Sequence, residues 1–183
     1  MKAILLIILC LSLIFGGCKK KESEGDMESK KGQLISKILQ QPYGKDVLPK
    51  VGTAEDFIQD INNPTPSPVV SLEDFFEGNE DLGSIGANLI EHPGIETFYR
   101  VLMEIRKRND VQDVLIIINQ IDENLDWPYS DSLYILTSCS KEQASKWVKP
   151  LKPDDIAEGW TWGKPPAAPQ PKEGYKVYWI WWD

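Results

Sequence analysis

Apolar and polar residues divide this chain into three blocks. Residues 3–15 are all apolar or small, residues 19–31 have one aliphatic side chain, and from residue 32 onward the two types alternate. A helix needs about 20 residues to cross a ~30 Å hydrocarbon core, so the first block is too short to span a membrane. With Lys2 before it and small residues after it, the block is typical of a secretory signal that is removed after export.

Residues 32–65 are predicted to form a helical N-terminal segment. Apolar residues at 34, 35, 38 and 39 have helical spacing, and Pro42 ends that pattern. A second short helix is expected from Thr53, whose hydroxyl can cap it, with Phe57, Ile58 and Ile61 on its apolar side. Three prolines within residues 62–68 then exclude regular structure, so we expect an α+β domain over residues 66–183.

The pattern in residues 66–183 predicts the order strand, helix, strand, strand, helix, strand. The strands are expected at 69–76, 114–121, 132–137 and 175–182; the helices follow Pro93 and Ser138 or Ser140. This βαββαβ order is typical of a two-layer, ferredoxin-like or related sandwich with the N-terminal helices packed on it.

Two features resist the ferredoxin-like arrangement. Residues 114–121 are apolar on both faces, although that topology places this strand at an edge. The connection over residues 149–174 is also long for a compact domain, and a one-turn helix at 154–158 would shorten it. The N-terminal helices covering the open sheet face would account for the first feature.

Phe15-Gly16-Gly17-Cys18, at the end of the signal, resembles the lipobox of bacterial lipoproteins, although Phe15 stands where leucine is usual. The resemblance implies that residues 1–18 are a signal peptide, and that Cys18 is acylated and becomes the new N-terminus. Each buried methylene contributes about 0.8 kcal/mol, so two or three acyl chains, such as palmitate, would hold the protein on a membrane. An ordinary signal peptide cut elsewhere, or an uncleaved anchor, is the alternative. The expected location is the bacterial cell envelope, with the protein anchored by lipid outside the cytoplasm.

The polar block over residues 19–31 is expected to be a disordered tether, because its charged composition cannot bury enough surface to offset the entropy of ordering. The whole chain has a formal net charge of −8, and its acidic residues lie mostly beyond this tether. An acidic body repels phosphate backbones, which argues against nucleic acid as a partner.

The sequence offers no catalytic or metal-binding motif that supports an assignment. Cys139 and His92 stand in no context typical of a nucleophile and its base. The acidic loop over residues 77–83 lacks the twelve-residue EF-hand pattern, and surface acids this numerous always yield pairs that imitate a glycosidase. We therefore expect no metal, no cofactor and no enzymatic activity.

The tryptophans near the C-terminus are the most unusual feature. Five of the seven lie in the last 24 residues, and along the final strand large rings point to both faces. We expect Trp179 and Trp181 in the core. The opposite row is expected either to lie under the proline-rich segment at residues 164–171, which we favour, or to form a binding surface. The candidate binding residues are Trp182, Tyr178, Trp160 and Trp162.

Residues 75–89, taken with the terminal Trp181-Trp182-Asp183, resemble uncharacterised bacterial domains found without a lipid anchor, and this resemblance implies no activity. The reading that the sequence favours is a non-enzymatic binding or interaction module with a protein or glycan partner in the envelope. Two alternatives remain: a membrane-tethered immunity-type protein that neutralises a toxin through its acidic surface, and an envelope hydrolase.

Overall fold

The computed structural model describes residues 24–49, 64–122 and 124–182. The predicted signal, Cys18 and the predicted helix from Thr53 lie outside these residues. In the described parts, no helix has the length and apolar character needed to cross a bilayer.

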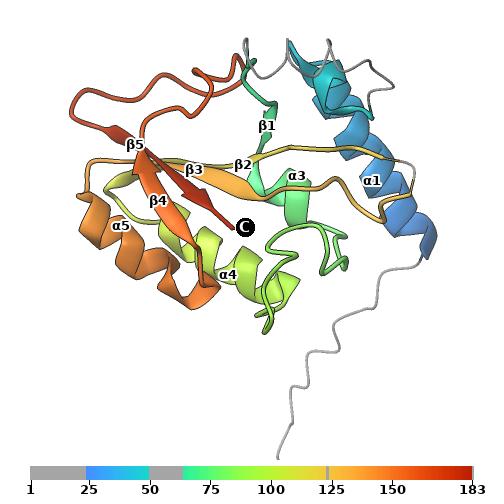
Figure 1. Ribbon diagram of the computed structural model, residues 1–183, viewed down its shortest axis with the longest axis horizontal. Helices are drawn as coiled ribbons and strands as arrows, with labels where there is room; N and C mark the ends of the chain where they lie inside the picture. The colour runs from blue at the N-terminus through green and yellow to red at the C-terminus, as the bar shows by residue number, and fades with distance from the viewer. Residues whose placement is uncertain (1–23, 50–63, 123, 183) are drawn as a thin grey trace, which may run out of the picture.

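The fold is α+β, as predicted, and is built on one antiparallel sheet of five strands (Figure 1). The strands are β1 (Val69–Val70), β2 (Val111–Ile117), β3 (Ser132–Thr137), β4 (Asp155–Glu158) and β5 (Lys176–Trp181). Their order across the sheet is β1-β2-β3-β5-β4, and all neighbours are antiparallel. Strand β2 is therefore interior, between β1 and β3, and not at an edge as in the ferredoxin-like order. An interior position explains why its residues are apolar on both faces.

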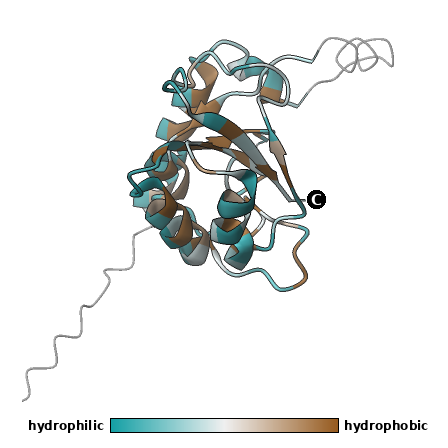
Figure 2. Cartoon of the chain, turned by 90° about the vertical axis from the view of Figure 1, so that its left-hand side faces the viewer, coloured by the Kyte–Doolittle hydropathy of each residue, from teal (hydrophilic) through white to brown (hydrophobic). Residues whose placement is uncertain are grey.

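The helices are α1 (Glu24–Leu39), α3 (Leu72–Phe76), α4 (Ile95–Arg106) and α5 (Lys141–Val148), with short 3-10 turns at Gly44–Val47 and Lys149–Leu151. Helices α4 and α5 lie along one side of the sheet, and the segment 159–175 runs along the other (Figure 1). Figure 2 shows the apolar sides of the helices turned towards the sheet. One large core lies between them, and a smaller apolar cluster lies on the opposite face.

The predicted strand at 69–76 is only two residues long and continues as helix α3. Ser71 accepts a hydrogen bond from the backbone N–H of Asp74, and Glu73 and Asp74 occupy the first turn, where acids favour a helix. The expected one-turn helix at 154–158 is instead the edge strand β4, paired with β5. In the first case the Ser71 cap favours a helix although the aromatic residues favour a strand. In the second case pairing with β5 favours a strand.

Helix α1 begins at Glu24, so residues 24–31, which composition assigns to a tether, are helical. Met27 packs against the core, and Lys31 Nζ donates to the carbonyl oxygen of Leu125 at 2.9 Å. These contacts with distant parts of the chain order residues 24–31, and composition alone cannot show them. Further along, Gln41 pairs with the edge strand β1, because its amide donates to the carbonyl of Val69 and accepts from the same residue's N–H.

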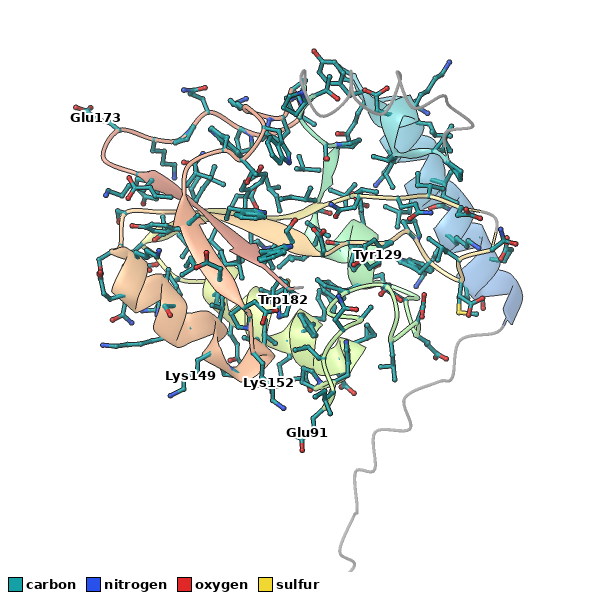
Figure 3. The ribbon with its side chains drawn as sticks, in the orientation of Figure 1. Glu91, Tyr129, Lys149, Lys152, Glu173 and Trp182 are labelled. Atoms are coloured by element: carbon teal, nitrogen blue, oxygen red, sulfur yellow. The ribbon has the colours of Figure 1, made fainter. Side chains whose placement is uncertain are left out.

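The two rows of side chains on β5 face the opposite way from the prediction, which placed Trp179 and Trp181 in the core. Tyr178, Ile180 and Trp182 face the helices and are almost fully buried, whereas Trp179 and Trp181 face the other side of the sheet. Figure 3 shows Trp182 inside the fold, while Lys149 and Glu173 project outward. The pairing with β3 explains the reversal: Tyr178 lies opposite Ile135 and Ile180 opposite Leu133, both residues of the helix-covered face.

Candidate functional site

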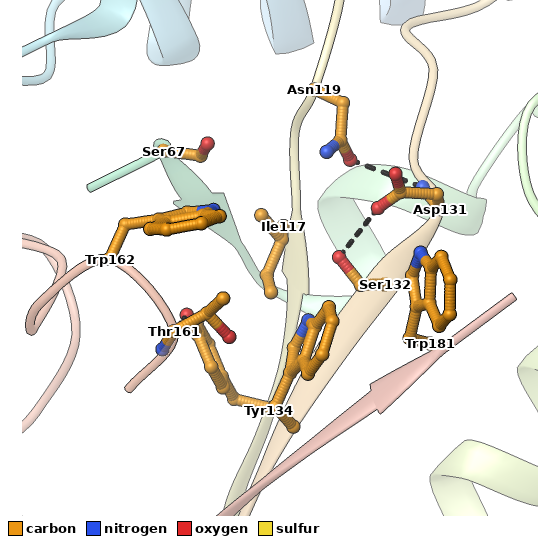
Figure 4. Close-up of a pocket in the computed structure, with 10 residues that line it drawn as sticks. Ser67, Ile117, Asn119, Asp131, Ser132, Tyr134, Thr161, Trp162 and Trp181 are labelled. Atoms are coloured by element: carbon orange, nitrogen blue, oxygen red, sulfur yellow. Dashed lines mark hydrogen bonds between the residues drawn. The ribbon is translucent and has the colours of Figure 1, made fainter. Parts of the chain in front are cut away.

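A hollow of about 240 Å³ lies on the sheet face opposite the helices (Figure 4). Three neighbouring strands line it through every second residue, as the strand period of two requires. Ile117 and Asn119 lie on β2 and just beyond it, Ser132 and Tyr134 on β3, and Trp179 and Trp181 on β5. Ser67, Asp131, Thr161 and Trp162 complete the lining from connecting segments.

Three indole rings form the apolar part of this hollow. The rings of Trp179 and Trp181 are stacked, with centroids 5.7 Å apart and planes 22° from parallel. Trp162 lies on the opposite side of Ile117 from Trp181 (Figure 4) and is 55% exposed. An exposed ring beside a stacked pair gives a bound molecule aromatic surface on more than one side.

The loop that carries Trp162 is shaped by glycines at both ends. Gly159 and Gly163 have φ angles of +112° and +91°, which strain a residue with a side chain. Within the loop, Trp160 packs edge-on against Tyr134, with ring centroids 4.7 Å apart. This contact turns Trp160 towards the sheet while its neighbour Trp162 stays at the surface.

The proline-rich segment covers the adjoining part of the same face, and not the row of Tyr178 and Trp182 that was expected to lie beneath it. Ala168 joins the smaller apolar cluster with Leu136 and Val177. The side chain of Gln112 fixes the segment, since it donates to the carbonyl of Gln170 at 2.9 Å and accepts from the N–H of Lys172 at 2.8 Å. Trp179 packs against this cluster at its edge, and the hollow is the part of the face left open beyond it.

Polar groups gather at one end of the hollow. Asn119 Oδ1 accepts the N–H of Asp131 at 3.1 Å, and Ser132 Oγ donates to Asp131 Oδ1 at 2.7 Å (Figure 4). Near Trp162, the N–H of Thr161 donates to the Tyr134 hydroxyl at 3.3 Å. The hydroxyl oxygen of Thr161 is buried beside the Tyr134 hydroxyl and is therefore not open to a ligand in the hollow.

Burial raises the pKa of the Tyr134 hydroxyl above its ordinary value, so this group keeps its proton at neutral pH. Asp131 is the one carboxylate among the described residues that line the hollow, and none of these residues is Lys, Arg or His. The site therefore combines aromatic surface with hydrogen-bonding groups and a single acid.

The structure divides the four candidate binding residues. Trp162 lines the hollow and Trp160 supports its wall. Trp182 and Tyr178 lie in the core, 2% and 0% exposed, and present no binding surface. Their polar atoms are used internally, since the Trp182 indole donates to the carbonyl of Leu151 and the Tyr178 hydroxyl donates to that of Cys139.

The polar residues of the hollow were not predicted from the sequence, and Trp179 and Trp181 were expected in the core. A usable signal was present, because Asn119 directly follows an unbroken apolar run and continues the row of Leu115 and Ile117. Assigning that row to an open face required the strand order, which the sequence did not reveal.

The weaker candidates of the sequence have structural partners instead. The ring of His92 contacts the carbonyl of Ile85 and accepts the N–H of Gly94. The Cys139 thiol donates to Asp110 Oδ2 at 2.8 Å, and that bond raises the pKa of the thiol. In the acidic loop, Asp81 Oδ1 accepts the N–H of Gly83, as in a turn. Over the described residues, no group of three or more His, Cys, Asp or Glu is placed to hold a metal.

The fold and the hollow thus define an α+β domain with one open, aromatic sheet face. The chain belongs to the Uncharacterized protein YfbO family, whose profile matches residues 45–180. It is 39% identical over 132 residues to the Uncharacterized protein YfbO of Escherichia coli (strain K12), a match that covers 68% of this chain and 89% of that protein. No solved structure matches the chain significantly. The predicted resemblance to an uncharacterised bacterial family is confirmed.

Proposed function

We propose that this protein is a lipid-anchored binding module of the bacterial cell envelope, and that the hollow beside Trp162 is its ligand site. The observation that carries the binding role is the combination, in one open hollow, of three indole rings with the Asn119 amide, whose oxygen is held by the N–H of Asp131 and whose Nδ2 is left to donate. Binding sites typically combine apolar walls with a few polar groups that fix the ligand's orientation.

The chemistry of the lining favours binding over hydrolysis. Glycoside hydrolases usually place two carboxyl groups about 5–10 Å apart, one on each side of the bond they cleave. Among the described residues of the hollow, Asp131 is the single carboxylate, and it accepts the hydroxyl of Ser132. This lining provides groups that hold and orient a ligand but no acid-and-base pair.

The anchor is proposed from the sequence. The charged start, the apolar run and Gly16-Gly17-Cys18 occur in the order that a lipoprotein signal requires. Metabolic labelling with a fatty acid is expected to mark the wild type and not Cys18→Ser. Equal labelling of both proteins would refute lipidation at Cys18 and leave the binding role untouched.

The binding role is tested with Trp162→Ala against Leu82→Ala. Both side chains are 55% exposed, but Leu82 does not line the hollow. Detergent-solubilised envelope is separated into glycan and protein fractions, and the binding of each fraction to the full-length protein is measured. We expect Trp162→Ala to lose binding that Leu82→Ala keeps. If both variants bind both fractions as the wild type does, the hollow is not the site.

A further inference from the structure

Hydrogen-bond geometry fixes which polar groups of the hollow are donors and which are acceptors. Asn119 Oδ1 accepts the N–H of Asp131, so the amide cannot flip and its Nδ2 is left to donate. Ser132 donates its hydroxyl proton to Asp131, so towards a ligand its oxygen can only accept a hydrogen bond. The Tyr134 hydroxyl accepts from Thr161 N–H, and its own proton faces the Thr161 hydroxyl.

This set of groups suits a ligand that carries both donors and acceptors. A hydroxyl-rich ligand satisfies all of these groups. A quaternary ammonium satisfies none of them, and burying the Asn119 amide beneath it would cost the hydrogen bonds that the amide makes with water.

The charge of the lining and the volume of the hollow further restrict the class of ligand. None of the described lining residues is Lys, Arg or His, so the lining offers no cationic side chain to pair with an anionic ligand. The volume of about 240 Å³ is below the roughly 300–1,000 Å³ of pockets that enclose drug-sized ligands. The hollow therefore accepts one small ring, and its open side lets a longer chain continue beyond it.

We propose that the hollow binds one neutral sugar ring of a glycan chain, with the C–H face of the ring on an indole and its hydroxyl edge on the Asn119 amide. This inference rests on the proposed binding role and names its ligand class. A pyranose ring carries a face of C–H groups and an edge of hydroxyls, which matches a hollow that has aromatic walls and a polar end.

The decisive variant is Asn119→Asp, which changes one atom of the hollow. The new carboxylate still accepts the N–H of Asp131, but it replaces the Nδ2 donor with an acceptor and adds a negative charge. The matched control is Asn88→Asp, which adds the same charge at an exposed residue outside the hollow. A sugar hydroxyl that accepts from Nδ2 loses that hydrogen bond in Asn119→Asp, whereas a cation must bind the variant more tightly.

Binding to the full-length protein in detergent is measured by titration calorimetry. The probes are glucose, N-acetylglucosamine, the β-linked tetrasaccharide of each, choline and a polyproline peptide. We expect a tetrasaccharide to bind more tightly than its monosaccharide, and Asn119→Asp and Trp162→Ala each to weaken binding about tenfold, the effect of losing one such contact. Asn88→Asp should bind like the wild type.

Each other outcome overturns the sugar proposal in a distinguishable way. A monosaccharide that binds as tightly as its tetrasaccharide would indicate a free sugar and not a glycan chain. Choline that binds more tightly to Asn119→Asp, or a polyproline peptide that requires Trp162, would replace the ligand class while the binding role stands. If no probe binds, the sugar class is refuted; the envelope fractions then decide whether the binding role falls with it.

Discussion

The indole Nε1 of Trp182 donates to the carbonyl oxygen of Leu151 at 2.8 Å, inside the core. The ring also packs against Phe98, with centroids 5.3 Å apart. Trp182 therefore ties the end of β5 to the turn that follows α5 and to helix α4. A residue at the very end of the chain acts as a central packing element, and stability should depend on it.

Trp182→Ala should destabilise the protein by about 3–5 kcal/mol, because it removes a large buried ring and leaves the Leu151 carbonyl unpaired. Trp181→Ala, at the half-buried position beside it, should cost about 1 kcal/mol. Urea unfolding of the two variants side by side measures the difference. Similar losses for both would contradict the assignment of the rows to the two faces.

The N-terminal half of helix α1 is predicted to contribute to stability. Met27 packs against the core while its neighbour Glu28 is exposed, so Met27→Ala should lower stability by about 1–2 kcal/mol and Glu28→Ala should change it little. A protein that starts at Gly32 should melt at a lower temperature than one that starts at Lys19. Equal melting temperatures would show that residues 24–31 act only as a tether.

Much of the fold followed from periodicity. The 3.6-residue pattern after Pro93 and the caps offered by Ser138 or Ser140 located α4 and α5, and runs of β-branched and aromatic residues located β2, β3 and β5. The site could not be predicted from periodicity, because β5 carries large aromatic rings on both faces. With Tyr178 and Trp179 both aromatic, amphipathicity does not say which row meets the helices, and only the strand order decides it.

The polar end of the hollow was hidden for a different reason. Asn119, Asp131 and Thr161 are separated by 12 and 30 positions in the chain and come together through the β2–β3 pairing and the glycine-bounded loop. No local pattern marks such a group. Helix α3 was missed because Phe75 and Phe76 favour strands, and only the Ser71 cap shows that a helix begins there.

The ion pair between Glu73 and Arg106 should make stability depend on pH. Arg106 Nη1 donates to Glu73 Oε2 at 2.6 Å and Nη2 donates to Oε1, and these bonds lower the pKa of Glu73 below its ordinary value of 4.5. A lowered pKa means that the unfolded chain binds the proton more readily. The contribution is therefore complete above pH 4.5 and is lost as the pH falls through the folded value.

Glu73→Gln should therefore lose about 1 kcal/mol of stability at pH 7, since the pair is bidentate but partly exposed. The difference from the wild type should shrink below pH 4.5. Glu104→Gln, which breaks the exposed pair with Arg100, is the control and should have little effect at either pH. A Glu73→Gln deficit that stays constant down to pH 3 would mean that the ionised pair does not cause it.

Asp113 should have the opposite pH dependence, because burial raises the pKa of its carboxyl above the ordinary value of 3.8. The folded state then binds the proton more readily than the unfolded chain, so stability falls as the pH rises from 3.8 through the folded value. Asp113→Asn removes the cost of ionisation, and its amide oxygen can still accept the N–H of Val114, which Asp113 Oδ1 accepts at 2.9 Å. The variant should be about 0.5 kcal/mol more stable than the wild type at pH 7, with the gain vanishing at low pH.

Asp155→Asn is the matched control, since Asp155 Oδ1 accepts the N–H of Ile156 in the same way but the residue is exposed. Chemical unfolding at pH 3.5 and pH 7 measures both variants, and an Asp113→Asn protein that is less stable at pH 7 would show that the ionised carboxylate, through its attraction to Arg106, stabilises the fold.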